Sequence, residues 1–143
     1  MLLFVLQLYL SILSQEQTVG HRGVTMAYTR EAARLRENIQ VITSTFESNN
    51  LRVLNIGCKP YSDDDADVSV YVEISTISGP SIPCDLEVKV NLYDSNGILY
   101  MTKSEYLPED EFNGYDTIEI QCYDSSHTLE KAVSGRLFVT RAY

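Results

Sequence analysis

Two short acidic runs are the first residues of this sequence that could do chemistry. One contains Asp63, Asp64, Asp65 and Asp67, and the other spans residues 109–111. Calcium binds six to eight oxygen ligands, which acidic loops at one end of a β-sandwich can supply. The spacing fits no EF-hand loop, so the first run predicts either a weak calcium site or an ordinary solvated turn.

The two histidines, His21 and His127, suggest a second metal chemistry. Cleavage after Gly20 would make His21 the amino terminus, and a terminal amine with two imidazoles can chelate copper. A copper-dependent secreted enzyme is therefore one prediction, and two surface histidines are the other. The sequence contains no G-x-S-x-G, no H-E-x-x-H and no glycine-rich phosphate loop. We otherwise expect no catalytic residues and no cofactor.

The three cysteines are Cys58, Cys84 and Cys122, and no pair has the C-x-x-C spacing of a structural zinc site. Cys58 and Cys122 both fall on the apolar side of an alternating run. They are therefore either buried free thiols or, in an oxidising compartment, a disulfide. In the chain-entropy model, a disulfide between these two residues closes a loop of about 65 residues and stabilises the fold by roughly 4 kcal/mol.

The N-terminal region, residues 1–20, begins with a run of mostly apolar residues, MLLFVLQLYLSIL. As a helix this run would span about 20 Å, which is short of the roughly 30 Å hydrocarbon core of a bilayer. Its length is typical of a signal peptide, with cleavage after Ser14 or Gly20. The alternative is an apolar segment that packs on the domain or on a partner. We therefore predict an exported or secreted protein, with a cytoplasmic one as the alternative, and membrane contact only through this region.

Residues 29–48 predict an amphipathic helix, which together with a linker makes up the region 21–50. The segment has no glycine or proline, and Thr29 is a candidate N-cap. Apolar residues recur at steps of three and four, as on one face of a helix. This stripe would either pack on the rest of the domain or mediate self-association as a short coiled coil. Its members are Leu35, Ile39, Ile42 and Phe46.

Residues 51–143 predict an antiparallel, immunoglobulin-like β-sandwich of six or seven strands. Apolar and polar residues alternate in several short runs, such as 68–74 and 86–92, which is typical of strands with one face on a core. Turn residues such as Asn96-Gly97 separate the runs, and no helical crossover lies between them. The predicted fold class is therefore mainly β, with one amphipathic helix before the sandwich.

Two stretches resemble known sandwich families. Val90-Asn91-Leu92-Tyr93-Asp94 resembles the hallmark hairpin of FxLYD-type domains, with Val90 in the place of the hallmark phenylalanine. Those domains are immunoglobulin-like modules of exported or membrane-tethered prokaryotic proteins. The stretch from Asp116 to Cys122 resembles the D-x-A-x-Y-x-C signature of immunoglobulin domains, and Leu54-x-Ile56-x-Cys58 resembles the strand that carries the first cysteine of such domains. Both resemblances imply the fold and neither implies a function.

Charge and composition narrow the range of functions. The chain of 143 residues has a net charge of −9, and residues 53–143 contain sixteen acidic residues against six basic ones. An acidic domain repels phosphate backbones, so we expect no nucleic-acid binding. We predict a non-catalytic protein-binding or assembly module whose partner, or second copy, binds through helix 29–48. A calcium-dependent adhesion or surface-binding domain and the copper enzyme are the alternatives.

Overall fold

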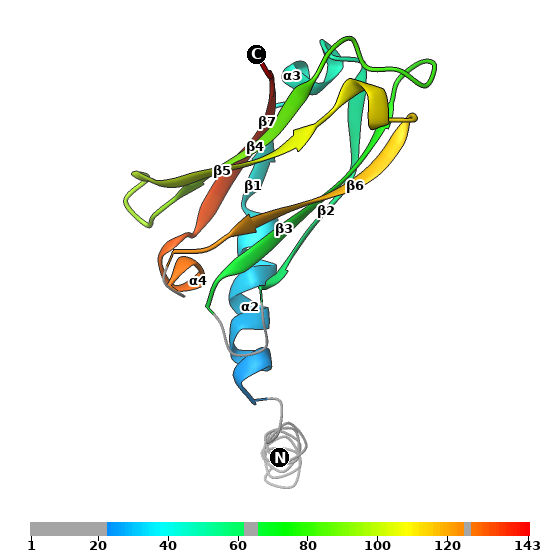
Figure 1. Ribbon diagram of the computed structural model, residues 1–143. Coiled ribbons are helices and arrows are strands. Elements are labelled where there is room, and N and C mark those ends of the chain that lie inside the picture. Colours follow the sequence, from blue (N-terminus) through cyan, green and yellow to red (C-terminus); the bar gives the residue numbers. More distant parts are fainter. Residues whose placement is uncertain (1–22, 62–65, 125–126) are drawn as a thin grey trace, which may run out of the picture.

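The computed structural model describes residues 23–61, 66–124 and 127–143, and these form a two-layer β-sandwich (Figure 1). In chain order the elements are α2 (Gly23–Glu37), β1 (Ile39–Val41), α3 (Thr43–Glu47), β2 (Leu51–Pro60), β3 (Val68–Thr76), β4 (Leu86–Tyr93), β5 (Leu99–Leu107), the 3-10 helix η1 (Glu109–Glu111), β6 (Tyr115–Cys122), α4 (Thr128–Lys131) and β7 (Ser134–Arg141). One sheet has the strand order β1-β7-β4-β5 and the other has β2-β3-β6. The predicted mainly-β sandwich preceded by a helix is therefore confirmed.

The core lies between the two sheets and follows the alternation of the sequence. In β3 and β4 every second residue is apolar and completely buried, including Val70, Ile74, Val88 and Leu92. The residues between them lie on the outer faces, because successive side chains of a strand point to opposite sides of its sheet. Neighbouring strands are antiparallel throughout, with the exception of β1 and β7.

The predicted continuous helix over residues 29–48 is wrong in its second half. Helix α2 ends at Glu37, and Asn38 closes it, since its backbone N–H donates to the Leu35 carbonyl and its side-chain amide to that of Arg34. The chain then forms the short strand β1, which pairs in parallel with β7, and the single turn α3. A strand partner at the edge of β7 outweighs the modest helix propensity of residues such as Ile39. The region 21–50 thus contributes a strand to the sandwich.

The apolar stripe of the predicted helix is divided among these elements. Leu35 of α2 and Phe46 of α3 are each 1% exposed and belong to the core. Ile39 lies in β1 and packs against the core, and Ile42 is half-buried between β1 and α3. The four side chains therefore do not form one helix face. Asn50, which has a left-handed φ of 61°, follows α3 and lies two residues beyond the predicted helix end at residue 48.

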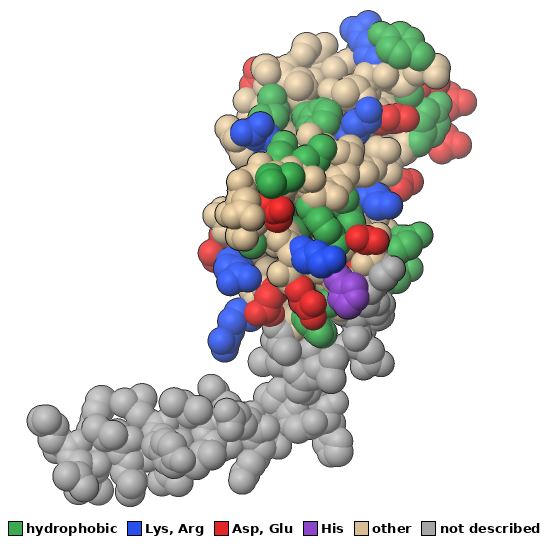
Figure 2. Space-filling model, turned by 90° about the vertical axis from the view of Figure 1, so that its left-hand side faces the viewer, with side chains coloured by type: hydrophobic (Ala, Val, Ile, Leu, Met, Phe, Trp, Pro, Cys, Tyr) green, Lys and Arg blue, Asp and Glu red, His purple; other side chains and the backbone are tan. Residues whose placement is uncertain are grey.

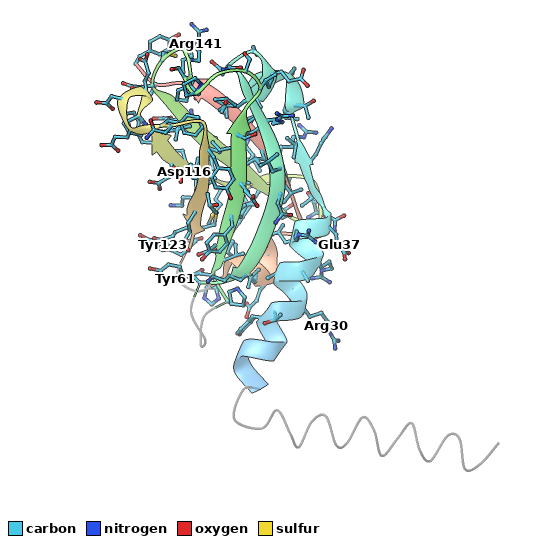
Figure 3. All side chains as sticks on the ribbon, turned by 90° about the vertical axis from the view of Figure 1, so that its right-hand side faces the viewer. Arg30, Glu37, Tyr61, Asp116, Tyr123 and Arg141 are labelled. Atoms are coloured by element: carbon cyan, nitrogen blue, oxygen red, sulfur yellow. The ribbon has the colours of Figure 1, made fainter. Side chains whose placement is uncertain are left out.

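Helix α2 lies beside β2, where its last turn covers part of the strand's outer edge (Figures 1 and 3). The Nε atom of Arg36 donates to the carbonyl oxygen of Ile56 at 2.6 Å. Figure 3 shows the side chains of Arg30 and Glu37 pointing away from the sheets into solvent. None of the helices in the described ranges is both long and apolar enough to cross a bilayer.

Candidate functional site

An apolar groove lies where α2, β1, α3 and β2 meet, and we call it the junction groove. Its volume is about 410 Å³, which falls in the range typical of ligand sites. Phe46 and Leu51 are buried there, and Leu54 is the most exposed of its apolar residues. The lining residues are Arg36, Val41, Thr43, Phe46, Glu47, Leu51, Arg52, Val53, Leu54, Asn55 and Ile56.

Two strand edges flank the junction groove. Among the described strands, β1 is the last of its sheet and β2 is the last of the other sheet. The outer side of an edge strand presents backbone N–H and C=O groups that a further strand can pair with. At β2 the bond from Arg36 to the Ile56 carbonyl already satisfies one of these outward groups. The remaining edge backbone and the apolar lining together can accommodate a segment in extended conformation.

A β-bulge in β2 shapes the wall of the groove. The pairing between β2 and β3 shifts register between Val53 and Asn55, which leaves Leu54 without a directly opposite residue. Bulges redirect side chains and often occur near functional sites. As a result Leu54 is 50% exposed although it belongs to a strand, and it presents an aliphatic side chain to the groove.

The rim of the junction groove carries more positive than negative charge. Arg36 and Arg52 line it together with a single acidic residue, Glu47. The Nε atom of Arg52 also donates to the Ser75 hydroxyl at 3.2 Å. This balance contrasts with the net charge of −9 of the whole chain. An apolar ligand that carries a carboxylate would therefore meet favourable electrostatics at this rim.

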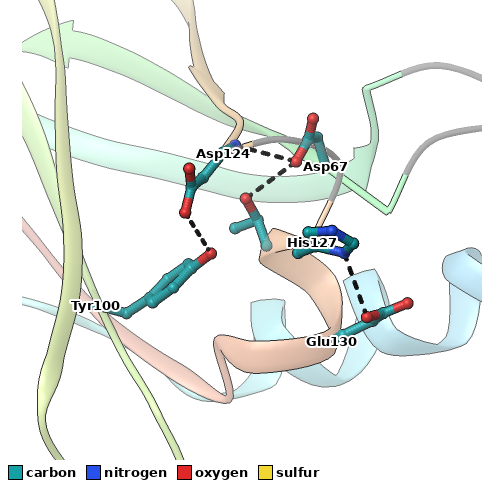
Figure 4. A network of polar contacts seen from close by, with 6 residues as sticks. Asp67, Tyr100, Asp124, His127 and Glu130 are labelled. Carbon is teal, nitrogen blue, oxygen red and sulfur yellow. Dashed lines mark hydrogen bonds and ion pairs between the residues drawn. The ribbon is translucent and has the colours of Figure 1, made fainter.

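At one end of the sandwich a polar network joins the start of β3 to the connection between β6 and α4 (Figure 4). Asp67 is 4% exposed, and its Oδ1 atom accepts hydrogen bonds from the Asp124 backbone N–H and the Thr128 hydroxyl, both at 3.2 Å. The Tyr100 hydroxyl donates to the Asp124 carboxylate at 2.9 Å. Burial, and then this bond to Asp124, raise the pKa of Tyr100 to about 12. These contacts anchor the connection structurally.

Of the residues predicted to bind metals, Asp67 and His127 lie at this end (Figure 4). Asp63, Asp64 and Asp65 lie outside the described residues, and the described member of the run, Asp67, binds the β6–α4 connection. Nowhere in the described ranges does a group of three or more His, Cys, Asp or Glu residues have the arrangement of a metal site. The calcium site therefore stays a prediction.

The structure describes one of the two histidines of the copper prediction. His21 lies outside the described residues, whereas His127 precedes α4 and has a half-exposed side chain. The Nδ1 atom of His127 lies 3.5 Å from Oε2 of Glu130, which belongs to the short helix that follows. His127 is thus placed as a surface histidine with an acidic neighbour.

The structure argues against the predicted Cys58–Cys122 disulfide. Both side chains face the core, as predicted, but both are free thiols and they lie in the same sheet with β3 between them. Strands are spaced by about 4.8 Å, so the two backbones are roughly 10 Å apart, whereas a disulfide requires Cα atoms within about 7 Å. Burial raises the pKa of each thiol to about 12, which makes both thiols poor nucleophiles at neutral pH.

Tyrosines on the outer face of the β2-β3-β6 sheet are bound to carboxylates. The Tyr71 hydroxyl donates to Glu119, and the Tyr115 hydroxyl donates to Glu73 at 2.9 Å. The bond from Tyr71 lowers the pKa of Glu119, because it stabilises the ionised carboxylate. These pairs cross between neighbouring strands and hold this face of the sheet in register.

Sequence reasoning did not identify the junction groove. Its walls come from two helices and two strands that belong to different sheets, so no local motif marks it. The signals present in the sequence were indirect: an aliphatic residue, Leu54, in an alternating run, and the arginines at positions 36 and 52 before an acidic domain.

Comparison with known proteins assigns no family. No family model and no curated protein matches the chain. A crystal structure of cj0090 from Campylobacter jejuni is similar to it at a TM-score of 0.39 and 11% identity, covering 73% of this chain and 98% of that one. A DUF1425 family member from Shewanella sp. pv-4 is similar at a TM-score of 0.43 and 17% identity, covering 66% and 81%. At TM-scores below 0.5 neither similarity carries an inference about this chain.

Proposed function

We propose that this chain is a non-catalytic protein-binding module and that the junction groove binds an extended apolar segment of a protein partner. The observation that carries the proposal is the groove itself, with a volume of about 410 Å³, a mostly aliphatic and aromatic lining, and a strand edge on each side. Burial of apolar surface would supply most of the favourable free energy of binding, which is offset in part by the entropy lost on association. Backbone pairing with a strand edge would fix the orientation.

The composition of the groove favours binding over catalysis. Its described lining contains no histidine or cysteine and a single carboxylate, Glu47. General acid–base and nucleophilic catalysis both require a reactive group held by a partner that activates it. The two arginines of the rim, Arg36 and Arg52, are suited instead to pairing with an acidic group of the bound segment.

Peptide binding tests the proposal directly. The probe is a fluorescently labelled octapeptide of alternating valine and glutamate residues, and the readout is fluorescence anisotropy. The test variant is Leu54→Lys, which places a charge in the groove at a half-exposed position. The matched control is Ile77→Lys, because Ile77 is 48% exposed and does not line the groove.

We expect wild type and Ile77→Lys to bind the peptide alike and Leu54→Lys to bind it at least about tenfold more weakly, as for loss of a central apolar contact. Amide chemical shifts should change mainly in residues 39–56. Equal binding by Leu54→Lys and wild type, or no saturable binding by either, would overturn the proposal.

We also propose that the module is exported and related to FxLYD-type domains. The apolar run in residues 1–13 supports export, and the sequence from Val90 to Asp94 supports the resemblance. The intact mass of the protein from its native source tests export: loss of the first 14 or 20 residues supports it, and a full-length mass contradicts it. The calcium and copper alternatives depend on Asp63–Asp65 and His21, which lie outside the described residues, so we advance the binding module alone.

A further inference from the structure

The tip of the β4–β5 hairpin exposes two consecutive aliphatic side chains. Ile98 is 61% exposed and Leu99 is 52% exposed. A single exposed aliphatic residue is ordinary, but two together at a projecting turn form a small apolar knob. Figure 2 views the molecule from the side on which this hairpin projects, and hydrophobic side chains gather near the middle of that face among charged ones.

This knob is held in a defined conformation. The carboxylate of Asp94 accepts hydrogen bonds from the backbone N–H groups of Asn96 at 2.9 Å and Ile98 at 3.0 Å. The Asp94 N–H also donates to the Ile98 carbonyl at 2.9 Å, and Gly97 takes a φ of 76° that closes the turn. A preorganised loop loses little conformational entropy when it binds. The free energy of its apolar contact is therefore not offset by a cost of ordering the turn.

The knob points away from the junction groove of its own chain. The turn continues β4 and β5 beyond the sheet, at the left of Figure 1, whereas the groove lies at the junction with α3 and β2. In the strand order β1-β7-β4-β5, β7 separates β4 from β1. The groove and the knob of one copy therefore lie on different parts of its surface, where each is open to a different molecule.

The knob and the junction groove are complementary in both polarity and charge. Between positions 91 and 102 the sequence has one charged residue, Asp94, beside the apolar pair Ile98 and Leu99. The groove has an apolar lining and a rim with Arg36 and Arg52. An apolar knob with one negative charge is thus the kind of element that the groove would accept.

We propose that the β4–β5 hairpin tip of one copy inserts Ile98 and Leu99 into the junction groove of a second copy. The inference rests on the proposed function, since it uses the same apolar groove, and names a second copy of the chain as the partner. The closed turn would fill the apolar lining, and pairing with a strand edge is not part of this contact. The contact is heterologous, because it joins two different surfaces, so each added copy leaves one knob and one groove free. Association then continues into chains or closes into a ring.

Sedimentation of the full chain and of three variants tests this contact up to roughly 1 mM, where weak contacts become populated. Leu54→Lys blocks the groove and keeps the knob, whereas a double variant, Ile98→Ser with Leu99→Ser, removes the knob and keeps the groove. Ile77→Lys is the control for an added surface charge. All the altered side chains are about half-exposed or more, so the fold should tolerate the changes.

We expect the average mass of wild type and Ile77→Lys to rise with concentration beyond a dimer, and each blocked variant to remain at 16.2 kDa. An equimolar mixture of the two blocked variants should form dimers and stop there, since it offers one intact knob and one intact groove. A monomeric wild type, association that is equal in all variants, or a mixture that stays monomeric would overturn the inference. If the valine–glutamate peptide still binds the groove in that case, the proposed function stands without self-association; if it does not, both fall.

Discussion

Gly135 determines how closely β1 can approach the rest of its sheet. It lies in β7 opposite Ile39, and it is buried. A Cβ atom added at this position would lie 3.0 Å from the carbonyl oxygen of Asn91, 3.1 Å from Cδ2 of Leu92 and 3.3 Å from Cγ1 of Ile39. The Asn91 oxygen belongs to the backbone of β4 and cannot rotate away, so Gly135→Ala requires β4 to shift by a few tenths of an ångström.

The expected cost follows from these contacts. Overpacking a core by one carbon typically costs 1–3 kcal/mol, and replacing a strand glycine recovers roughly 0.5–1 kcal/mol of chain entropy. We therefore expect Gly135→Ala to lower the free energy of unfolding by about 1–2 kcal/mol. Gly57→Ala is the matched control, because its added Cβ meets nothing closer than the Cβ of Tyr71 at 3.8 Å. This control should be neutral or stabilising by up to about 1 kcal/mol.

Equilibrium unfolding in urea distinguishes the two variants. With a slope of about 1–3 kcal/mol per M, the midpoint of Gly135→Ala should fall by roughly 0.5–1 M, and that of Gly57→Ala should stay level or rise. A Gly135→Ala protein as stable as wild type would show that β4 and β1 can give way without loss. The close packing of β4 and β1 around Gly135 would then not be needed for stability.

Three further predictions concern the polar network, a thiol and a carboxylate. In a double-mutant cycle of Asp67→Ala and Thr128→Val, urea unfolding should show a coupling energy of about 1–2 kcal/mol, and additive effects would mean that their hydrogen bond contributes nothing. Because burial raises the pKa of Cys122 to about 12, its alkylation at pH 8 should be roughly 1,000-fold slower in the folded than in the unfolded protein, as mass spectrometry can measure; equal rates would contradict this. The lowered pKa of Glu119 contributes stability above the unfolded-state pKa that is lost as pH falls through the folded-state value; in Tyr71→Phe the pKa should rise in an NMR titration and this acid-dependent loss should shrink, and an unchanged titration would contradict the role of Tyr71.

The strands of the sandwich could be read from the sequence because their signal is local. Apolar residues at every second position in 68–74 and 86–92 predicted which side chains face the core, and the structure confirms this. The turn at Asn96-Gly97 followed from glycine's access to a positive φ, which the structure shows as 76°. Periodicity and turn chemistry involve neighbours in the chain, so they need no knowledge of the fold.

Helix 29–48 shows where local reasoning failed. Its spacing of apolar residues is that of a helix, yet Ile39 belongs to a strand because β7 offers a partner there and Gly135 leaves room for it. Pairing with a strand distant in sequence outweighs a helix propensity that differs by only tenths of a kcal/mol per residue.

The sequence by itself determined the strand faces, the hairpin turn and the inward orientation of Cys58 and Cys122, because each depends on the residues immediately around it. Tertiary structure alone decided that these two cysteines share a sheet with a strand between them, since the order of strands depends on contacts far apart in the chain. The tertiary structure also forms the junction groove and separates that groove from the apolar knob. Both arise from the way in which two sheets and two helices pack, and no stretch of the chain encodes that packing alone.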